Sequence, residues 1–271
     1  MKHRHTLILL SVALPICVLL RAMQMYFTID GVTGFVKQQY SAISVIITVI
    51  ICAASAAIGL LAATIDEVKQ NANKQRPAVA IAGVLAGGMF IYQAVAGFSV
   101  VGSGAWYDAL LVLLSFVSAF VFVAYGLKNI YDYNLPSILL ISPVLYYIVK
   151  LISVFVSTAK LALVTENIFL IFTSGVLLWF MLEFASFENG IGDVDKRPKK
   201  LFAAGLAAVM LCGVTAIPKL AFAVLNIMKL EAEDIASALI NVAIGVFILV
   251  YILCNFGDKR ESKKAVGKHS A

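Results

Sequence analysis

Apolar residues occupy this chain in long runs that short polar segments interrupt. Eight runs are each long enough to cross a hydrocarbon core of about 30 Å as a helix of roughly 20 residues. They cover residues 6–26, 41–64, 77–99, 107–127, 136–157, 167–187, 201–222 and 235–255. The pattern predicts an all-α integral membrane bundle of eight transmembrane helices, with residues 1–271 in a single transmembrane domain.

The composition agrees with a lipid environment. Hydrophobic residues make up 62% of the chain and charged residues 13%, with a mean hydropathy of +0.96. Soluble domains contain roughly 45–50% apolar and about 25% charged residues. The connections between the runs are too short for a soluble domain, so the lipid bilayer is the main predicted partner and any activity lies in the membrane. We expect residues 257–271 to form a disordered cytoplasmic tail.

The net charge of +6 reflects an uneven distribution of basic residues between the two sides of the membrane. Of the 21 Lys and Arg residues, 15 fall on one side of the predicted layout, and only Lys37, Lys160 and Lys229 fall on the other. The 15 are Lys2, Arg4, Lys69, Lys74, Arg76, Lys128, Lys196, Arg197, Lys199, Lys200, Lys259, Arg260, Lys263, Lys264 and Lys268. Cytoplasmic loops carry such an excess, so both termini are predicted to be cytoplasmic, and no nucleic-acid partner is expected.

The N-terminal MKHRH and the apolar run after it resemble the start of a signal peptide. No small-x-small cleavage pattern follows, so we expect the first helix to be retained. Cys17, Cys52, Cys212 and Cys254 each lie alone in a separate span, which predicts apolar packing and no metal site or disulfide.

A weak internal repeat relates the two halves of the chain. A shift of 126 residues places Tyr125 on Tyr251 and Asn129 on Asn255, and also Asp108 on Asp234. Because four helices are an even number, such a duplication gives two halves of the same orientation. The sequence therefore suggests two parallel four-helix repeats, residues 1–134 and 135–256, although chance alignment of apolar residues is the alternative.

A shorter pattern suggests that each repeat is built from helical hairpins. In four spans a helix-weakening residue precedes a polar one by about six positions. The pairs are Pro15 with Arg21, Gly87 with Gln93, Pro143 with Lys150, and Gly213 with Lys219. In the last three, an acid follows at the start of the returning span: Asp108, Glu166 and Asp234.

Three cations inside spans, Arg21, Lys150 and Lys219, are the most informative polar residues. A charge at the bilayer centre costs roughly 2.5–3.5 kcal/mol on insertion scales, so such residues usually face the bundle interior or water. Together with Gln93 they are predicted to line a polar site, with Asp30, Asp108, Glu166 and Asp234 as counter-ions. The site is either a charge network or a cavity for an anionic solute. The alternative is that each cation extends to the interface independently.

Two further patterns carry structural expectations. Small residues spaced four apart, Gly83 with Gly87 and Ala53 with Ala57, predict close helix packing within the bundle. Aromatic residues near span ends, among them Trp106, Tyr131 and Tyr251, predict interfacial anchoring.

Catalytic motifs are weak. The segment GIGD, Gly190 to Asp193, resembles the signature of intramembrane aspartyl proteases, but a charged segment follows it in a predicted solvated loop. Histidine occurs only at His3, His5 and His269, and no phosphate-binding loop of the GxxxxGK[ST] type is present. The sequence therefore predicts no enzyme, no metal and no cofactor.

The segment LLRAMQMYFTIDGVTGF, Leu19 to Phe35, resembles the opening of uncharacterised multi-spanning membrane proteins of Gram-positive gut bacteria. The resemblance implies a bacterial cytoplasmic membrane and carries no activity. Two functions fit the sequence. One is a carrier or permease subunit for a small solute, with a membrane or ATPase subunit as its candidate partner. The other is a non-transporting scaffold or sensor within a larger complex.

Overall fold

The eight predicted spans are confirmed. The computed structural model describes residues 3–28, 37–65, 76–101, 106–131, 133, 135–160, 165–191, 193, 196–228, 230 and 232–256. Within these ranges lie eight helices that are long and apolar enough to cross a membrane. They are α1 (His3–Thr28), α2 (Ser41–Ala63), α3 (Pro77–Val101), α4 (Trp106–Tyr131), α5 (Ser142–Lys160), α6 (Thr165–Glu188), α7 (Arg197–Val224) and α8 (Ala232–Asn255). The predicted tail 257–271 and Asp30 lie outside the described residues.

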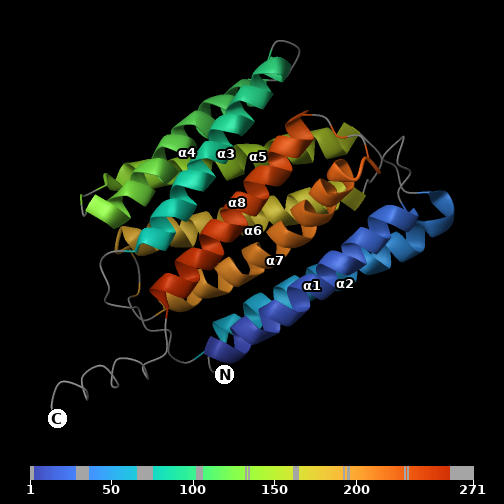
Figure 1. The fold of residues 1–271 in the computed structure, drawn as a ribbon, viewed down its shortest axis with the longest axis horizontal. Coiled ribbons are helices and arrows are strands. Elements are labelled where there is room, and N and C mark those ends of the chain that lie inside the picture. Colours follow the sequence, from blue (N-terminus) through green and yellow to red (C-terminus); the bar gives the residue numbers. More distant parts are fainter. Residues whose placement is uncertain are drawn as a thin grey trace.

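Helix α1 packs against α2, and from α3 to α8 each helix packs against the next one. We call the antiparallel pairs α1–α2, α3–α4, α5–α6 and α7–α8 hairpins. In Figure 1 the α1–α2 hairpin forms one flank and α3–α4 the opposite flank, with α8 between them. We call the end where α1 begins and α8 ends the terminal end, and the opposite end the distal end. A duplication would make the pair α3 and α8 equivalent to the pair α7 and α4. Among the described residues α3 packs along α8, whereas α4 and α7 share no comparable contact. The four-helix duplication therefore stays a sequence prediction that these contacts do not reproduce.

Helix α7 forms the centre of the bundle and contacts α1, α2, α6 and α8. Its middle is rich in small side chains, Ala203, Ala204, Gly205, Ala207 and Ala208, all of them buried. Small residues let several helix backbones approach one helix closely, which favours association where lipid supplies no hydrophobic driving force.

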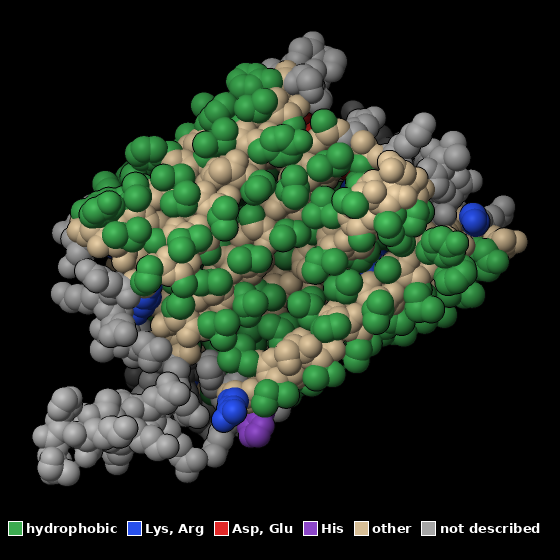
Figure 2. Space-filling model, in the orientation of Figure 1, with side chains coloured by type: hydrophobic (Ala, Val, Ile, Leu, Met, Phe, Trp, Pro, Cys, Tyr) green, Lys and Arg blue, Asp and Glu red, His purple; other side chains and the backbone are tan. Residues whose placement is uncertain are grey.

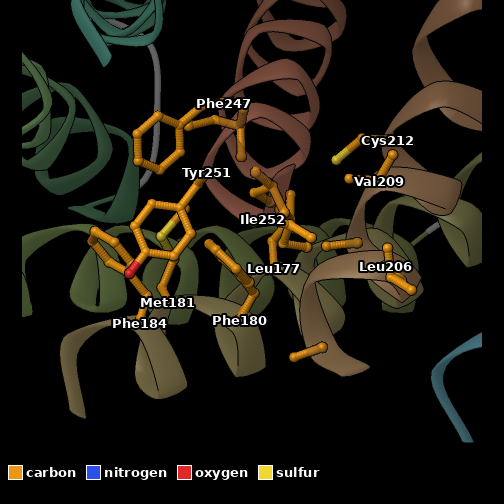
Figure 3. Close-up of a cluster of buried hydrophobic side chains, with 14 of the residues drawn as sticks. Leu177, Phe180, Met181, Phe184, Leu206, Val209, Cys212, Phe247, Tyr251 and Ile252 are labelled. Atoms are coloured by element: carbon orange, nitrogen blue, oxygen red, sulfur yellow. The ribbon is translucent and has the colours of Figure 1, made fainter. Parts of the chain in front are cut away.

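Aromatic side chains fill the core on the other side of α8. Phe184 of α6 contacts Tyr251 of α8 at 5.2 Å between ring centroids, and Phe122 of α4 contacts Phe247 of α8 at 5.1 Å. In the view of Figure 3, Tyr251 lies between Phe247 and Phe184, and Ile252 and Leu177 lie between these rings and Leu206 of α7. Edge-to-face ring pairs of this kind join α4, α6 and α8.

The outer surface is apolar, as a lipid-facing surface requires. Figure 2 shows hydrophobic side chains spread over the visible face, with Lys and Arg side chains mainly towards its edges. An apolar groove of about 360 Å³ lies between α2 and α6, with Ala207 and Leu211 of α7 at its base. The groove separates much of α2 from α6, so the α1–α2 hairpin is held mainly through α7.

The helix-weakening residues do not break their helices. Helix α1 continues through Pro15, α3 through Gly87 and α7 through Gly213, while Pro143 occupies the first turn of α5. Proline is tolerated in a first turn because the N–H it lacks has no helical partner there. The helical backbone therefore continues past Pro15, Gly87 and Gly213, and Pro143 lies within the start of its helix.

Close packing through glycine is confirmed for α3 and α4 but not for the alanine pair. Gly83 and Gly87 lie against α4, whereas Ala53 and Ala57 of α2 are exposed on the outer surface. The prediction that Ala53 and Ala57 pack against a neighbouring helix is wrong, because the buried residues Ile51, Ser55 and Ile58 lie on another face of α2.

Two adjacent glycines of α3 allow a matched test of this packing. An added Cβ at Gly87 would lie 2.6 Å from Val123 Cγ2 and 2.8 Å from the Ala119 carbonyl oxygen, whereas one at Gly88 would meet nothing within 4 Å. We expect Gly87→Ala to lower the free energy of unfolding by about 1–3 kcal/mol. Gly88→Ala should be neutral or stabilising by up to about 1 kcal/mol. Unfolding by SDS in mixed micelles measures both, and equal stability of the two variants would contradict the packing.

Candidate functional site

Arg21 lies at the distal end of α1 and points into the bundle. Its side chain is 1% exposed, and its Nη1 donates a 2.7 Å hydrogen bond to Gln24 Oε1. Gln24 Nε2 in turn donates to the Ser44 carbonyl oxygen at 2.7 Å and to Thr48 Oγ1 at 2.9 Å. Residues 21 and 24 lie one turn apart on the same helix face, so Gln24 links the guanidinium to α2.

Glu166 joins three helices through two ion pairs. Its Oε2 lies 2.6 Å from Arg21 Nη2, and its Oε1 lies 3.1 Å from Lys219 Nζ. Lys219 Nζ also lies 3.0 Å from Asp234 Oδ1. We call Arg21, Glu166, Lys219 and Asp234 the distal charge network; it connects α1, α6, α7 and α8.

The surroundings of this network compensate its charges. Glu166 lies in the first turn of α6 and Asp234 in the first turn of α8, where helix dipoles stabilise negative charge. The guanidinium of Arg21 also lies 4.1 Å from the centroid of the Phe169 ring. Two cations therefore face two carboxylates, and the network is neutral overall.

The predicted cations do not all behave alike. Arg21 and Lys219 are buried and ion-paired, so independent extension to the interface does not describe them. Lys150 of α5 is half-buried and makes no ion pair with any residue in the part of the chain that the structure describes. Its ammonium lies within electrostatic range of Glu233, Asp234, Asp108 and Lys219.

Gln93 and Asp108 belong to a second polar group, which we call the distal recess. This recess of about 20 Å³ is lined by Gln93, Gly97, Asp108, Leu111, Val112, Ser115, Tyr146 and Glu233. Gln93 is 7% exposed, and its Oε1 has no hydrogen-bond partner. The predicted single site is thus divided into a charge network and a neighbouring recess.

Sequence reasoning missed several polar residues of the distal end. Gln24 carries no charge that would distinguish it in the sequence. Ser44 and Thr48 look like ordinary small residues of an apolar span. Glu233 precedes the predicted counter-ion Asp234, and a preference for the first turn of a helix applies equally to both acids.

A second polar cluster lies at the terminal end. The hydroxyls of Tyr125 and Tyr251 both donate to Glu188 Oε1, at 2.7 and 2.8 Å, and Lys128 Nζ lies 3.3 Å from Glu188 Oε2. We call Tyr125, Lys128, Glu188 and Tyr251 the terminal cluster. Interfacial anchoring is therefore wrong for Tyr251, which is fully buried because its hydroxyl has a partner inside the bundle.

The repeat-related positions meet at this cluster. Asn129 and Asn255 each donate a side-chain hydrogen bond to the carbonyl oxygen four residues earlier, at Tyr125 and Tyr251. The backbone N–H of Arg76 donates to the Asn129 carbonyl oxygen, and its guanidinium donates to Asn255 Oδ1. Equivalent residues of α4 and α8 thus have similar local roles around one carboxylate and one arginine.

The GIGD segment does not form a paired-carboxylate site among the described residues. Asp193 is exposed in the connection between α6 and α7, and its carboxylate pairs with Lys196 at 3.3 Å. No group of three or more His, Cys, Asp or Glu residues able to hold a metal is found within the described ranges.

No protein-family model, no curated protein and no solved structure matches this chain. Any function therefore has to follow from the chemistry of its own sites.

Proposed function

We propose that the protein is a carrier or permease subunit for a small solute and that the distal charge network closes its solute path at one end. The supporting observation is the convergence of ionisable side chains from α1, α6, α7 and α8 within apolar spans. Ionisable residues at membrane depth are rare and typically mark a solute or ion pathway.

The way in which the network joins the helices supports a gate. Glu166 links α6 to Arg21 of α1, yet α1 and α6 share little direct helix packing. The apolar groove also separates much of α2 from α6. A contact made by side chains alone can break and reform while the α1–α2 hairpin stays packed on α7.

The balance of charge favours a cationic or neutral solute over an anion. Among the described distal residues, the carboxylates are Asp108, Glu166, Glu233 and Asp234, against the cations Arg21, Lys150 and Lys219. This excess of carboxylates disfavours the anionic solute that the cations alone suggested.

The second candidate function is a non-transporting scaffold or sensor. The specific observation that favours it is the pairing of Arg21 and Lys219, which leaves neither cation free for a solute. In that case the network fixes the positions of the hairpins, and the protein acts through a membrane partner.

The remaining parts of the proposal come from the sequence. The resemblance of Leu19 to Phe35 suggests a bacterial cytoplasmic membrane, and the distribution of Lys and Arg favours a terminal end that faces the cytoplasm. A non-enzymatic role and an ATPase partner subunit complete the proposal.

Uptake into proteoliposomes separates the two functions. We expect the purified protein to accumulate at least one member of a panel of radiolabelled amines, amino acids and carboxylic acids above protein-free liposomes. Lys150→Met should shift this uptake towards the cationic members of the panel, because it removes the ammonium that lies near the carboxylates of Asp108 and Glu233.

Lys200→Met is the matched control, since Lys200 is exposed at the terminal end and should leave uptake intact. Failure of the folded wild-type protein to accumulate any of these solutes would favour the scaffold. Unchanged uptake by Lys150→Met would remove Lys150 from the solute path.

A further inference from the structure

The distal recess offers mainly hydrogen-bond acceptors at its polar positions. Gln93 contributes an amide oxygen that is buried without a partner, and Asp108 and Glu233 contribute carboxylates. Ser115 Oγ donates its proton to the Leu111 carbonyl oxygen at 2.7 Å and is also hydrogen-bonded to the Tyr146 hydroxyl, so Ser115 Oγ keeps one lone pair as an acceptor. A buried amide oxygen without a partner costs about 1–3 kcal/mol, which a bound donor or cation would recover.

Among the residues that the structure describes, the charges around the recess leave a deficit of one positive charge. Arg21 and Lys219 balance Glu166 and Asp234 within the distal charge network. The ammonium of Lys150 then stands against the two carboxylates of the recess, Asp108 and Glu233. One further monovalent cation would make this group of described residues neutral.

The volume limits the size of the occupant. About 20 Å³ exceeds the roughly 10–15 Å³ that a single water requires, but it cannot admit an organic solute. Oxygen ligands of this kind, from carboxylates, amides and hydroxyls, suit hard cations. The ammonium of Lys150 leaves the two carboxylates of the recess with one net negative charge among the described residues, which favours a singly charged ion over a divalent metal.

We propose that the distal recess binds one Na⁺ ion through Gln93 Oε1, Ser115 Oγ and the carboxylates of Asp108 and Glu233. The recess is formed by α3, α4, α5 and α8, so the ion would tie the α3–α4 hairpin to α8 beside the distal charge network. A role of this ion in driving uptake rests on the proposed carrier function, whereas its binding does not.

Thermal unfolding in detergent tests the binding. The fluorescence of Trp106 and Trp179 is followed in NaCl, KCl and choline chloride at constant ionic strength. We expect Na⁺ to raise the midpoint saturably relative to choline, because a ligand that binds only the folded state stabilises it. K⁺ should have a smaller effect, since the recess is small.

Variants locate the site. Gln93→Leu removes the amide oxygen at similar size and should abolish the Na⁺-dependent shift, as should Glu233→Gln. Ser118→Ala is the control, because Ser118 is a buried hydroxyl of α4 without a partner that does not line the recess, and it should keep the full shift. If Gln93→Leu does not fold, Glu233→Gln and Ser115→Ala report on the same site.

Identical midpoints of the wild-type protein in all three salts would overturn the site and indicate that water or a proton occupies the recess. A Na⁺ shift that survives Gln93→Leu and Glu233→Gln would also overturn it. Uptake under an imposed Na⁺ gradient keeps the two proposals apart. A Na⁺ shift without any uptake supports the ion site and rejects the carrier, whereas uptake without a Na⁺ shift rejects the ion site alone.

Discussion

Replacing Glu166 by Gln is expected to lower the free energy of unfolding by about 3–5 kcal/mol. The carboxylate of Glu166 is the shared partner of Arg21 and Lys219, and the Arg21 side chain is 1% exposed. Its loss leaves a buried guanidinium whose remaining polar contact is Gln24, and it leaves Lys219 with Asp234 alone. Unfolding by SDS in mixed micelles measures the change.

Two further variants test whether the unpaired guanidinium of Arg21 causes the loss of stability. Glu183→Gln changes another half-buried acid of α6, whose side chain accepts a hydrogen bond from Trp179 at 3.4 Å, and should cost no more than about 0.5 kcal/mol. Adding Arg21→Met to Glu166→Gln should recover part of the lost stability, because no guanidinium is then left without its carboxylate. If Glu166→Gln is as stable as Glu183→Gln, the network contributes nothing to the fold.

The spans could be predicted because lipid imposes a simple rule on the sequence. Every backbone polar group must be satisfied within its own segment, so each crossing appears as an uninterrupted apolar helix. The run 41–64 therefore coincides with α2, and the run 167–187 with α6, to within a few residues. The order in which the hairpins pack could not be predicted, because an apolar surface suits lipid as well as it suits another helix.

The sequence predicts which charged residues form the candidate site, but not which of them pair with one another. Arg21 and Lys219 stand out in sequence because a charge in an apolar span is costly. Asp234 pairs with Lys219 from the next helix, as the hairpin pattern suggests, but Glu166 follows Lys150 in sequence and pairs with Arg21 and Lys219. That choice depends on how separate hairpins meet, which local spacing does not encode.

In the terminal cluster, too, the sequence identifies some of the residues but not the partner that joins them. The repeat pattern predicts that Tyr125 and Tyr251 are equivalent positions. It does not predict Glu188, the acid that accepts a hydrogen bond from both hydroxyls. Glu188 is the last residue of α6, where a polar residue looks like the ordinary end of a span. Only the approach of α4 and α8 around α6 shows that this carboxylate lies inside the bundle.

Replacing Glu188 by Leu is expected to lower the free energy of unfolding by about 2–4 kcal/mol. The change leaves two tyrosine hydroxyls without their acceptor, on side chains that are 3% and 0% exposed, and removes the partner of Lys128. Glu188→Gln keeps an acceptor oxygen for the hydroxyls and should cost only about 1 kcal/mol, as should Tyr251→Phe, which removes a single donor. SDS unfolding of the three variants measures the series. Equal costs for Glu188→Leu and Tyr251→Phe would mean that Glu188 acts on Tyr251 alone and that the terminal cluster does not join α4, α6 and α8.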